Sequence, residues 1–152
     1  MKWRSKDLKQ YLQAKEYIDT IMVPLVPFHL SNEQDMEKDS FRNEVLTVFS
    51  NEMEKELSGR MMLMPVYNYI KSTDMNVEKD RLNDWVEDIK VQPFKHIFFI
   101  TFDSKWRKLE QELDGTLIWL PTVQTGDILS KELQSMIREQ VKEITEFIRS
   151  YW

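Results

Sequence analysis

The segment His96-Ile-Phe-Phe-Ile-Thr-Phe-Asp103 decides the fold that we predict for this chain of 152 residues. It is an almost unbroken run of apolar side chains that ends on an acid. Because successive side chains of a strand point to opposite faces, this run predicts a strand covered on both faces, as in a parallel sheet between layers of helices. Such sheets bind ligands at the carboxyl ends of their strands, so Asp103 marks the first place to search for a site.

The segments around this strand alternate between helical and extended patterns. Helices are expected over residues 5–18 and 32–58, before Pro93, before Gly115, and from Asp127 or Ser130 to the end, and further strands over 20–24, 61–65 and 116–120. This alternation predicts one α/β domain with three layers, in which a mostly parallel, Rossmann-like sheet of about four strands is flanked by helices.

Three details of this assignment can be checked directly. Pro24 and Pro27 lack N–H donors that would face opposite edges of a strand, so the first strand is expected to end by about Pro24. Residues 66–74 are expected to form a polar and aromatic loop. In the last helix one stripe of apolar side chains is expected to face the core, namely Leu133, Met136, Ile137, Val141, Ile144 and Ile148.

Composition excludes several classes of protein. Charged residues make up 31% and hydrophobic residues 41% of the chain, as in soluble globular proteins, and no apolar run approaches the roughly 18 residues of a membrane span. The start lacks the apolar core of a signal peptide, so a cytoplasmic protein is expected. The absence of cysteine removes disulfides, thiolate zinc sites and iron–sulfur clusters, and the net charge of -5 argues against nucleic acid.

The chain has three glycines, Gly59, Gly115 and Gly126, and each falls next to an expected helix. A Walker loop or a dinucleotide-binding fingerprint needs several glycines in one strand-to-helix turn, and a nucleophile elbow needs glycines around a serine. None of these motifs occurs, so no nucleotide cofactor is expected.

Asp103 and His29 are the candidate site residues, because each follows an expected strand. Asp103 suits a catalytic carboxylate or a metal ligand, or it caps the helix that starts at Lys105. His29 suits a ligand or a proton carrier, or it packs beside its apolar neighbours. His96 precedes its strand and should lie at the opposite edge of the sheet.

Other side chains could complete a pocket or a partner surface. Five polar residues that follow expected strands would line a pocket if the strands align: Tyr67, Asn68, Tyr69, Thr101 and Thr122. Trp3 and Trp152 lie near the chain ends, where they either anchor a partner or pack on the sheet.

Two resemblances follow from local segments. Residues 6–20, Val23-Pro-Leu-Val-Pro27 and Trp119-Leu-Pro-Thr122 make the chain similar to the YpiF-like family of uncharacterised small proteins from Bacillus-type Gram-positive bacteria. That resemblance covers nearly the whole chain and implies a bacterial cytosolic protein without an assigned activity.

The chain also resembles the creatininase-like metal-dependent amidohydrolases in the path from Pro24 to His29, in Asp39, in Met64-Pro65 and in Thr101-Phe-Asp103. Against that pattern, Pro27 replaces a glutamate, Thr101 an asparagine and Asp103 a histidine. The resemblance implies that His29, Asp39 and Asp103 could hold one divalent metal ion.

Two functions are compatible with these observations. The first is a non-enzymatic cytosolic accessory or protein-interaction domain that needs no cofactor and binds a protein partner. The alternative is a divalent-metal amidohydrolase that acts on a C–N bond, with metal-activated water as the nucleophile.

Overall fold

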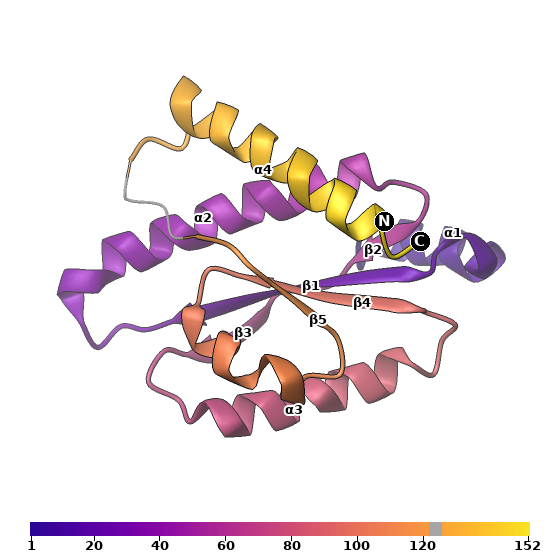
Figure 1. Ribbon diagram of the computed structural model, residues 1–152, viewed down its shortest axis with the longest axis horizontal. Coiled ribbons are helices and arrows are strands. Elements are labelled where there is room, and N and C mark those ends of the chain that lie inside the picture. Colours follow the sequence, from indigo (N-terminus) through magenta and orange to yellow (C-terminus); the bar gives the residue numbers. More distant parts are fainter. Residues whose placement is uncertain (122–125) are drawn as a thin grey trace.

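The computed structural model describes residues 1–121 and 126–152, which form three layers around a parallel sheet (Figure 1). In chain order the elements are α1 (Ser5–Gln13), η1 (Lys15–Tyr17), β1 (Thr20–Phe28), α2 (Glu33–Glu56), β2 (Met61–Leu63), β3 (Tyr67–Ile70), α3 (Met75–Ile89), β4 (His96–Thr101), η2 (Ser104–Glu112), β5 (Thr116–Trp119) and α4 (Lys131–Arg149). The α/β class and the mostly parallel sheet predicted from the sequence are confirmed, with five strands.

β4 has the central position that its apolar run predicts. The strand order is β2-β1-β4-β5, with β3 also paired to β1, and all of these pairings are parallel. Phe98, Phe99 and Ile100 of β4 are fully buried. Their side chains alternate between the two faces, so both faces need a cover of helices.

β1 is longer than predicted, and residues 66–74 are not wholly a loop. β1 runs for nine residues through both prolines, and the second half of it pairs with β3, which lies within the expected loop. Met22 pairs with Leu63 and Leu25 with Tyr67, so the edge chain has one residue more than β1 between these pairs. This extra residue is a bulge that divides one edge strand into β2 and β3.

The sheet tolerates Pro24 and Pro27 because neither proline lies opposite a backbone carbonyl that needs an N–H donor from β1. The carbonyl oxygen of Met22 accepts the N–H of Met64, and that of Leu25 accepts the Thr101 hydroxyl at 2.9 Å on the other side. By alternation, Pro24 faces the bulge between β2 and β3, and Pro27 faces the region beyond the end of β4. The two prolines do face opposite sides of β1, but each lies opposite an interruption in the neighbouring strand.

Helices cover the two faces as layers: α2 and α4 lie on one side of the sheet, and α3 and the 3₁₀ segment η2 lie on the other (Figure 1). One core cluster, between the sheet and α2 and α4, contains Met22, Phe49, Met53, Phe98 and Ile148. A second cluster, between the sheet and α3 and η2, includes Ile21, Leu82, Val86, Phe99 and Trp106. The first helix ends at Gln13, earlier than predicted, and a short 3₁₀ turn leads into β1.

The apolar stripe predicted for the last helix is largely confirmed. Ile137, Val141 and Ile148 are buried in the core, and Leu133 and Ile144 pack against it. Met136, at the margin of the stripe, is 37% exposed. Burial of such a stripe is the main force that holds an amphipathic helix in place.

The two chain ends lie next to each other beside the amino ends of the strands (Figure 1). Residues 1–2 extend the sheet next to β2, where Leu63 N–H donates to the Met1 carbonyl at 2.8 Å. Trp152 packs against the core cluster below α4, as expected for a closing terminus, whereas Trp3 is largely exposed.

No helix among residues 1–121 and 126–152 is long and apolar enough to cross a membrane.

Candidate functional site

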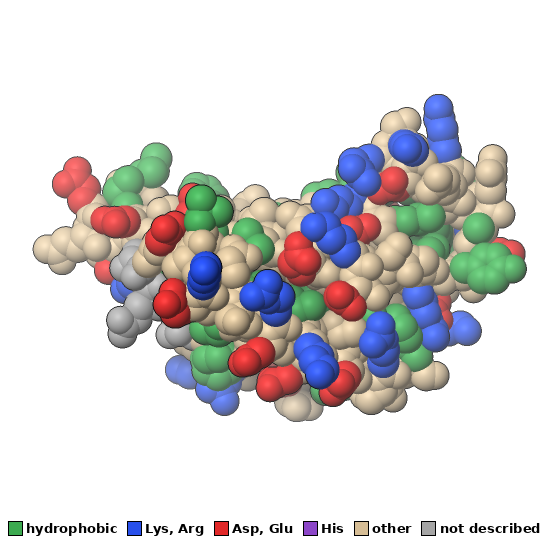
Figure 2. Space-filling view, turned by 90° about the horizontal axis from the view of Figure 1, so that it is seen from above, with side chains coloured by type: hydrophobic (Ala, Val, Ile, Leu, Met, Phe, Trp, Pro, Cys, Tyr) green, Lys and Arg blue, Asp and Glu red, His purple; other side chains and the backbone are tan. Residues whose placement is uncertain are grey.

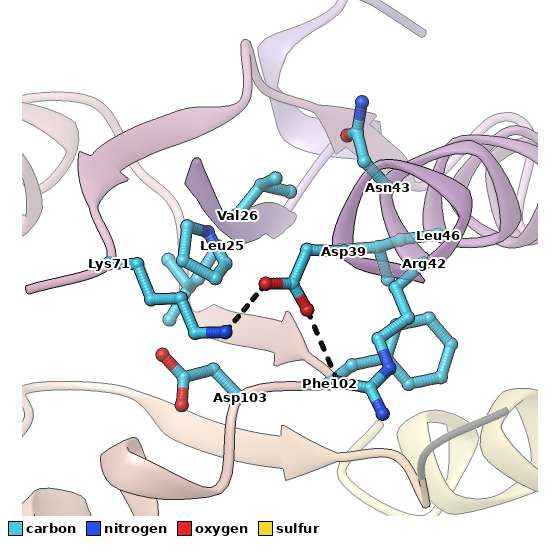
Figure 3. A pocket seen from close by; sticks show the side chains of 10 residues that line it. Leu25, Val26, Asp39, Arg42, Asn43, Leu46, Lys71, Phe102 and Asp103 are labelled. Carbon is cyan, nitrogen blue, oxygen red and sulfur yellow. Dashed lines mark hydrogen bonds and ion pairs between the residues drawn. The ribbon is translucent and has the colours of Figure 1, made fainter. Parts of the chain in front are cut away.

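The carboxyl edge of the sheet brings together residues that are far apart in the sequence. His29 follows β1, Lys71 follows β3 and Asp103 follows β4, while Asp39 comes from the second turn of α2. A pocket of about 80 Å³ opens here, enough for a few water molecules. Its lining consists of Leu25, Val26, Pro27, Asp39, Arg42, Asn43, Leu46, Lys71, Phe102 and Asp103 (Figure 3).

Asp39 is the centre of this site. Its Oδ2 accepts from Lys71 Nζ at 2.6 Å and lies 2.8 Å from His29 Nε2, and its Oδ1 lies 3.5 Å from Arg42 Nη1. Figure 3 shows the Asp39 carboxylate between Lys71 on one side and Arg42 on the other. The carboxylate is therefore neutralised by cations from α2 and from the residue after β3, without any external ligand.

The charges of this cluster shift two pKa values in opposite directions. Burial alone would raise the pKa of Asp39, but hydrogen bonds from Lys71 and His29 and the charges of Lys71 and Arg42 bring it below its ordinary value. The hydrogen bond to Asp39 raises the pKa of Lys71. Both shifts favour the charged pair at neutral pH.

Asp103 has separate partners. Its Oδ1 accepts the N–H of Lys105 at 3.0 Å, which confirms the predicted capping interaction, and the helix that it caps is the 3₁₀ segment η2. Its Oδ2 accepts the Tyr69 hydroxyl at 2.7 Å. Both carboxylate oxygens are thus bound by neutral donors from the protein itself.

Part of the predicted polar pocket exists as a hydrogen-bond chain. Trp106 Nε1 donates to the Tyr69 oxygen at 2.8 Å, and the Asp103 N–H donates to the Thr101 hydroxyl at 3.0 Å. Burial, together with the nearby Asp103 charge, raises the pKa of Tyr69, so its hydroxyl remains a donor.

The remaining described members of that predicted pocket do not join this hydrogen-bond chain, although the Tyr67 ring lies 6.0 Å from that of Tyr69. Tyr67 donates to Glu78 at 2.9 Å below the sheet, Asn68 is exposed, and Thr122 lies outside the described residues. His96 lies at the opposite edge of the sheet, as predicted, with its ring 6.4 Å from that of Tyr151.

The residues at this edge do not fit a three-ligand metal site. His29 and Asp39 contact each other, but Asp103 is held by Tyr69 and by the backbone of η2. A cation on Asp39 would meet the Lys71 ammonium, 2.6 Å from Oδ2, and the Arg42 guanidinium, 3.5 Å from Oδ1. Within the described part of the chain, no three or more His, Cys, Asp or Glu side chains are grouped so that they could hold a metal ion.

Two polar atoms of the cluster lack a hydrogen-bond partner in the described part of the chain. His29 Nδ1 and Arg42 Nε are buried without a hydrogen bond among the described residues. Sequence reasoning did not find Arg42 or Lys71. Arg42 follows Asp39 by three positions on α2, a spacing that permits an ion pair. Lys71 follows β3, a strand whose sequence pattern predicts a loop.

The fold defines the chain as a three-layer α/β protein with a parallel sheet. It belongs to the family described as protein of unknown function (DUF2487), whose model matches residues 9–152. It is 30% identical to the uncharacterized protein YpiF of Bacillus subtilis (strain 168), over 100% of this chain and 98% of that protein. The predicted resemblance to this family is confirmed.

One solved structure has a related outline. It is the crystal structure of a putative creatinine amidohydrolase from Bacteroides fragilis NCTC 9343, with a TM-score of 0.46 and 16% sequence identity. The match covers 73% of this chain, and the chain spans about half, 53%, of that protein.

Proposed function

We propose that this protein is a non-enzymatic cytosolic accessory protein that acts by binding another protein. The observation that carries the proposal is the state of the two carboxylates at the carboxyl edge. Asp39 is bound by Lys71, His29 and Arg42, and Asp103 by Tyr69 and the N–H of Lys105. A general base or a metal ligand needs a free lone pair directed toward a substrate or an ion.

The electrostatics of the site support the same proposal. The pKa of Asp39 is lowered by cations that contact it directly, which makes its carboxylate a weaker proton acceptor at neutral pH. The Lys71 ammonium has its pKa raised, so it is a poor nucleophile.

The alternative remains the divalent-metal amidohydrolase acting on a C–N bond. The observation in its favour is the contact of 2.8 Å between His29 Nε2 and Asp39 at the carboxyl edge, next to a pocket with room for a few waters. In that reading His29 and Asp39 would exchange their present partners for an ion, and Asp103 would turn away from Tyr69.

Creatinine hydrolysis separates the two readings. The full chain, purified without a metal-affinity tag, is incubated with creatinine in the presence of Zn²⁺, Mn²⁺ or Mg²⁺, and ring opening is followed by chromatography. The proposal expects the same rate as in a matched Asp39→Asn, Asp103→Asn double variant. Turnover by the wild type that the double variant lacks would establish the alternative.

A further inference from the structure

The outer side of α4 carries apolar side chains that the core does not use. Met136, Phe147 and Tyr151 are 37%, 41% and 44% exposed. Their spacing of eleven and four residues places them on one side of the helix and its C-terminal extension, next to the buried stripe that contains Ile137. The apolar row that these three side chains form is interrupted, because Gln140 and Glu143 lie between Met136 and Phe147 on the same side of α4.

The two aromatic members of this row are held in fixed positions. The Phe147 and Tyr151 rings lie 5.3 Å apart, and both contact the fully buried Phe98 of β4, at 6.4 and 5.2 Å between ring centroids. Edge-to-face contacts of this kind stabilise aromatic pairs. A surface that is ordered before binding loses less side-chain entropy when a partner docks.

A row of acids runs along the solvent side of the apolar row. Glu132, Glu139 and Glu143 are exposed, and their spacing of seven and four residues puts them on one side of α4. None of the three forms an ion pair with another described residue. The basic residues Arg138 and Lys142 instead line a hollow between α4 and α2.

Figure 2 looks onto this layer of the molecule and shows acidic, basic and apolar side chains over it. The separation of charges along α4 means that a partner on the apolar row meets glutamates on one flank. The row and its three glutamates, which we call the α4 surface, comprise Met136, Phe147, Tyr151, Glu132, Glu139 and Glu143.

We propose that the α4 surface docks a basic amphipathic helix of a partner protein. The apolar row takes the apolar face of that helix, and the three unpaired glutamates take its Lys or Arg side chains. A second copy of this chain is a poorer occupant, because its own α4 surface has no Lys or Arg side chain to offer to the three glutamates. This inference rests on the proposed function, which it extends by naming the surface and the chemistry of the partner.

The test uses the full chain and a fluorescein-labelled amphipathic peptide with leucines on one helical face and lysines on the other. Binding is measured by anisotropy at low and at physiological salt. A peptide with glutamates in place of the lysines is the probe control, and it should not bind.

Two triple variants of the protein are compared, one that tests the glutamates of α4 and one in α3 that serves as its control. Glu132→Gln, Glu139→Gln and Glu143→Gln together change the net charge from -5 to -5 + 3 = -2, and so do Asp84→Asn, Glu87→Gln and Asp88→Asn on the exposed side of α3. We expect the α4 triple variant to weaken peptide binding about fivefold and the α3 triple variant by less than about twofold. Met136→Ser should weaken binding about threefold, because it removes an apolar side chain that is 37% exposed in the folded chain and open to a partner.

Equal losses in the two triple variants, or unchanged binding in the α4 variant, would overturn the inference. So would a concentration-dependent dimer in sedimentation that Phe147→Ser dissociates, since a second copy would then occupy the surface. These outcomes leave the proposed function standing, whereas metal-dependent hydrolysis of creatinine removes the proposed function and leaves the peptide result unaffected.

Discussion

The amino edge of the sheet, where the parallel strands begin, and the carboxyl edge, where they end, each hold a partly buried aspartate. The charge of the aspartate is neutralised in a different way at each edge. At the amino edge Asp19 accepts two hydrogen bonds from Arg60, at 3.0 and 3.1 Å, and one from Thr20. The Arg60 guanidinium lies 4.1 Å from the centre of the Trp152 ring, and Trp152 Nε1 donates to Thr20 at 2.8 Å. The start of β1, the start of β2 and the end of the chain are thereby joined in one closed network.

The carboxyl edge is less closed. Asp39 receives Lys71 and His29 on one oxygen and a longer contact of 3.5 Å from Arg42 on the other. His29 Nδ1 and Arg42 Nε are buried without a described partner, and a pocket of about 80 Å³ lies beside Asp39. A paired arginine in fork geometry fixes a structure, whereas single contacts from flexible cations neutralise a charge with less geometric constraint. We conclude that the amino edge is built for stability.

The largest effect should come from opening the amino edge. Arg60→Ala leaves the buried Asp19 carboxylate without its cation and removes the stacking partner of Trp152. We expect a loss of about 2–3 kcal/mol in the free energy of unfolding, measured by urea denaturation. Arg60→Lys keeps the charge but not the fork of the guanidinium, so its stability should fall between those of the wild type and Arg60→Ala. A loss below about 1 kcal/mol for Arg60→Ala would contradict the closed network.

Removing the charge at the carboxyl edge should cost less. Asp39→Asn keeps an acceptor for one hydrogen bond but leaves Lys71 with only the longer contact to Asp35 as a counter-charge. We expect a loss of about 1–2 kcal/mol by the same measurement. Asp35→Asn is the control, because Asp35 is more exposed and contacts Lys71 only at 3.7 Å, so it should change stability by less than about 0.5 kcal/mol. A larger loss for Asp39→Asn than for Arg60→Ala would reverse the comparison.

Acid should weaken both edges. The pKa values of Asp19 and Asp39 are lowered in the folded protein, because hydrogen bonds and charges from their cations outweigh the effect of burial. The stability that each carboxylate contributes is therefore complete above its unfolded pKa of about 4 and is lost as the pH falls through the folded pKa.

The two aspartates can be separated by their variants. Chemical denaturation between about pH 6 and pH 2 should show a steep loss of stability below about pH 4 in the wild type and a shallower loss in Asp39→Asn. Asp19→Asn should flatten the same part of the curve. A curve for Asp39→Asn that runs parallel to the wild type would mean that Asp39 is not paired as described.

The smallest effect concerns the last residue of the chain. Trp152→Phe removes the 2.8 Å hydrogen bond to Thr20 but keeps an aromatic ring beside Arg60. We expect a loss of about 1 kcal/mol. Thr20→Val should give a larger loss, because it also removes the hydrogen bond that Thr20 donates to Asp19. The double variant should lose less than the sum of the two, because both changes break the bond between Trp152 and Thr20. Additive losses would show that the two side chains act independently.

The sequence predicts the central parts of this fold better than its edges. The apolar run of β4 and the apolar stripe of α4 are repeated signals along many residues, and both lie where expected. The length of β1 could not be predicted, because Pro24 and Pro27 are tolerated only where neighbouring strands are interrupted. β3 has four residues with polar and aromatic side chains, so its pattern alone did not distinguish it from a loop.

The candidate site could be predicted only in part. Asp103 follows a strongly patterned strand, and its capping contact is local, so both readings of it were available from the sequence. A family resemblance implied that His29 and Asp39 share a metal ion, and the structure brings the two side chains into direct contact instead. The pairing of Asp39 with Lys71 joins residues 32 positions apart through a strand that the sequence did not reveal, so no local pattern pointed to it.

Metal content is the most direct test of the central claim that internal cations occupy the carboxylates at the carboxyl edge. The chain is purified without a metal-affinity tag, incubated with Zn²⁺ or Mn²⁺, desalted and analysed by mass spectrometry for metals. We predict no stoichiometric metal, and the same trace amounts in the wild type, Asp39→Ala and Asp103→Ala. One metal ion per chain in the wild type that is absent from both variants would contradict the account.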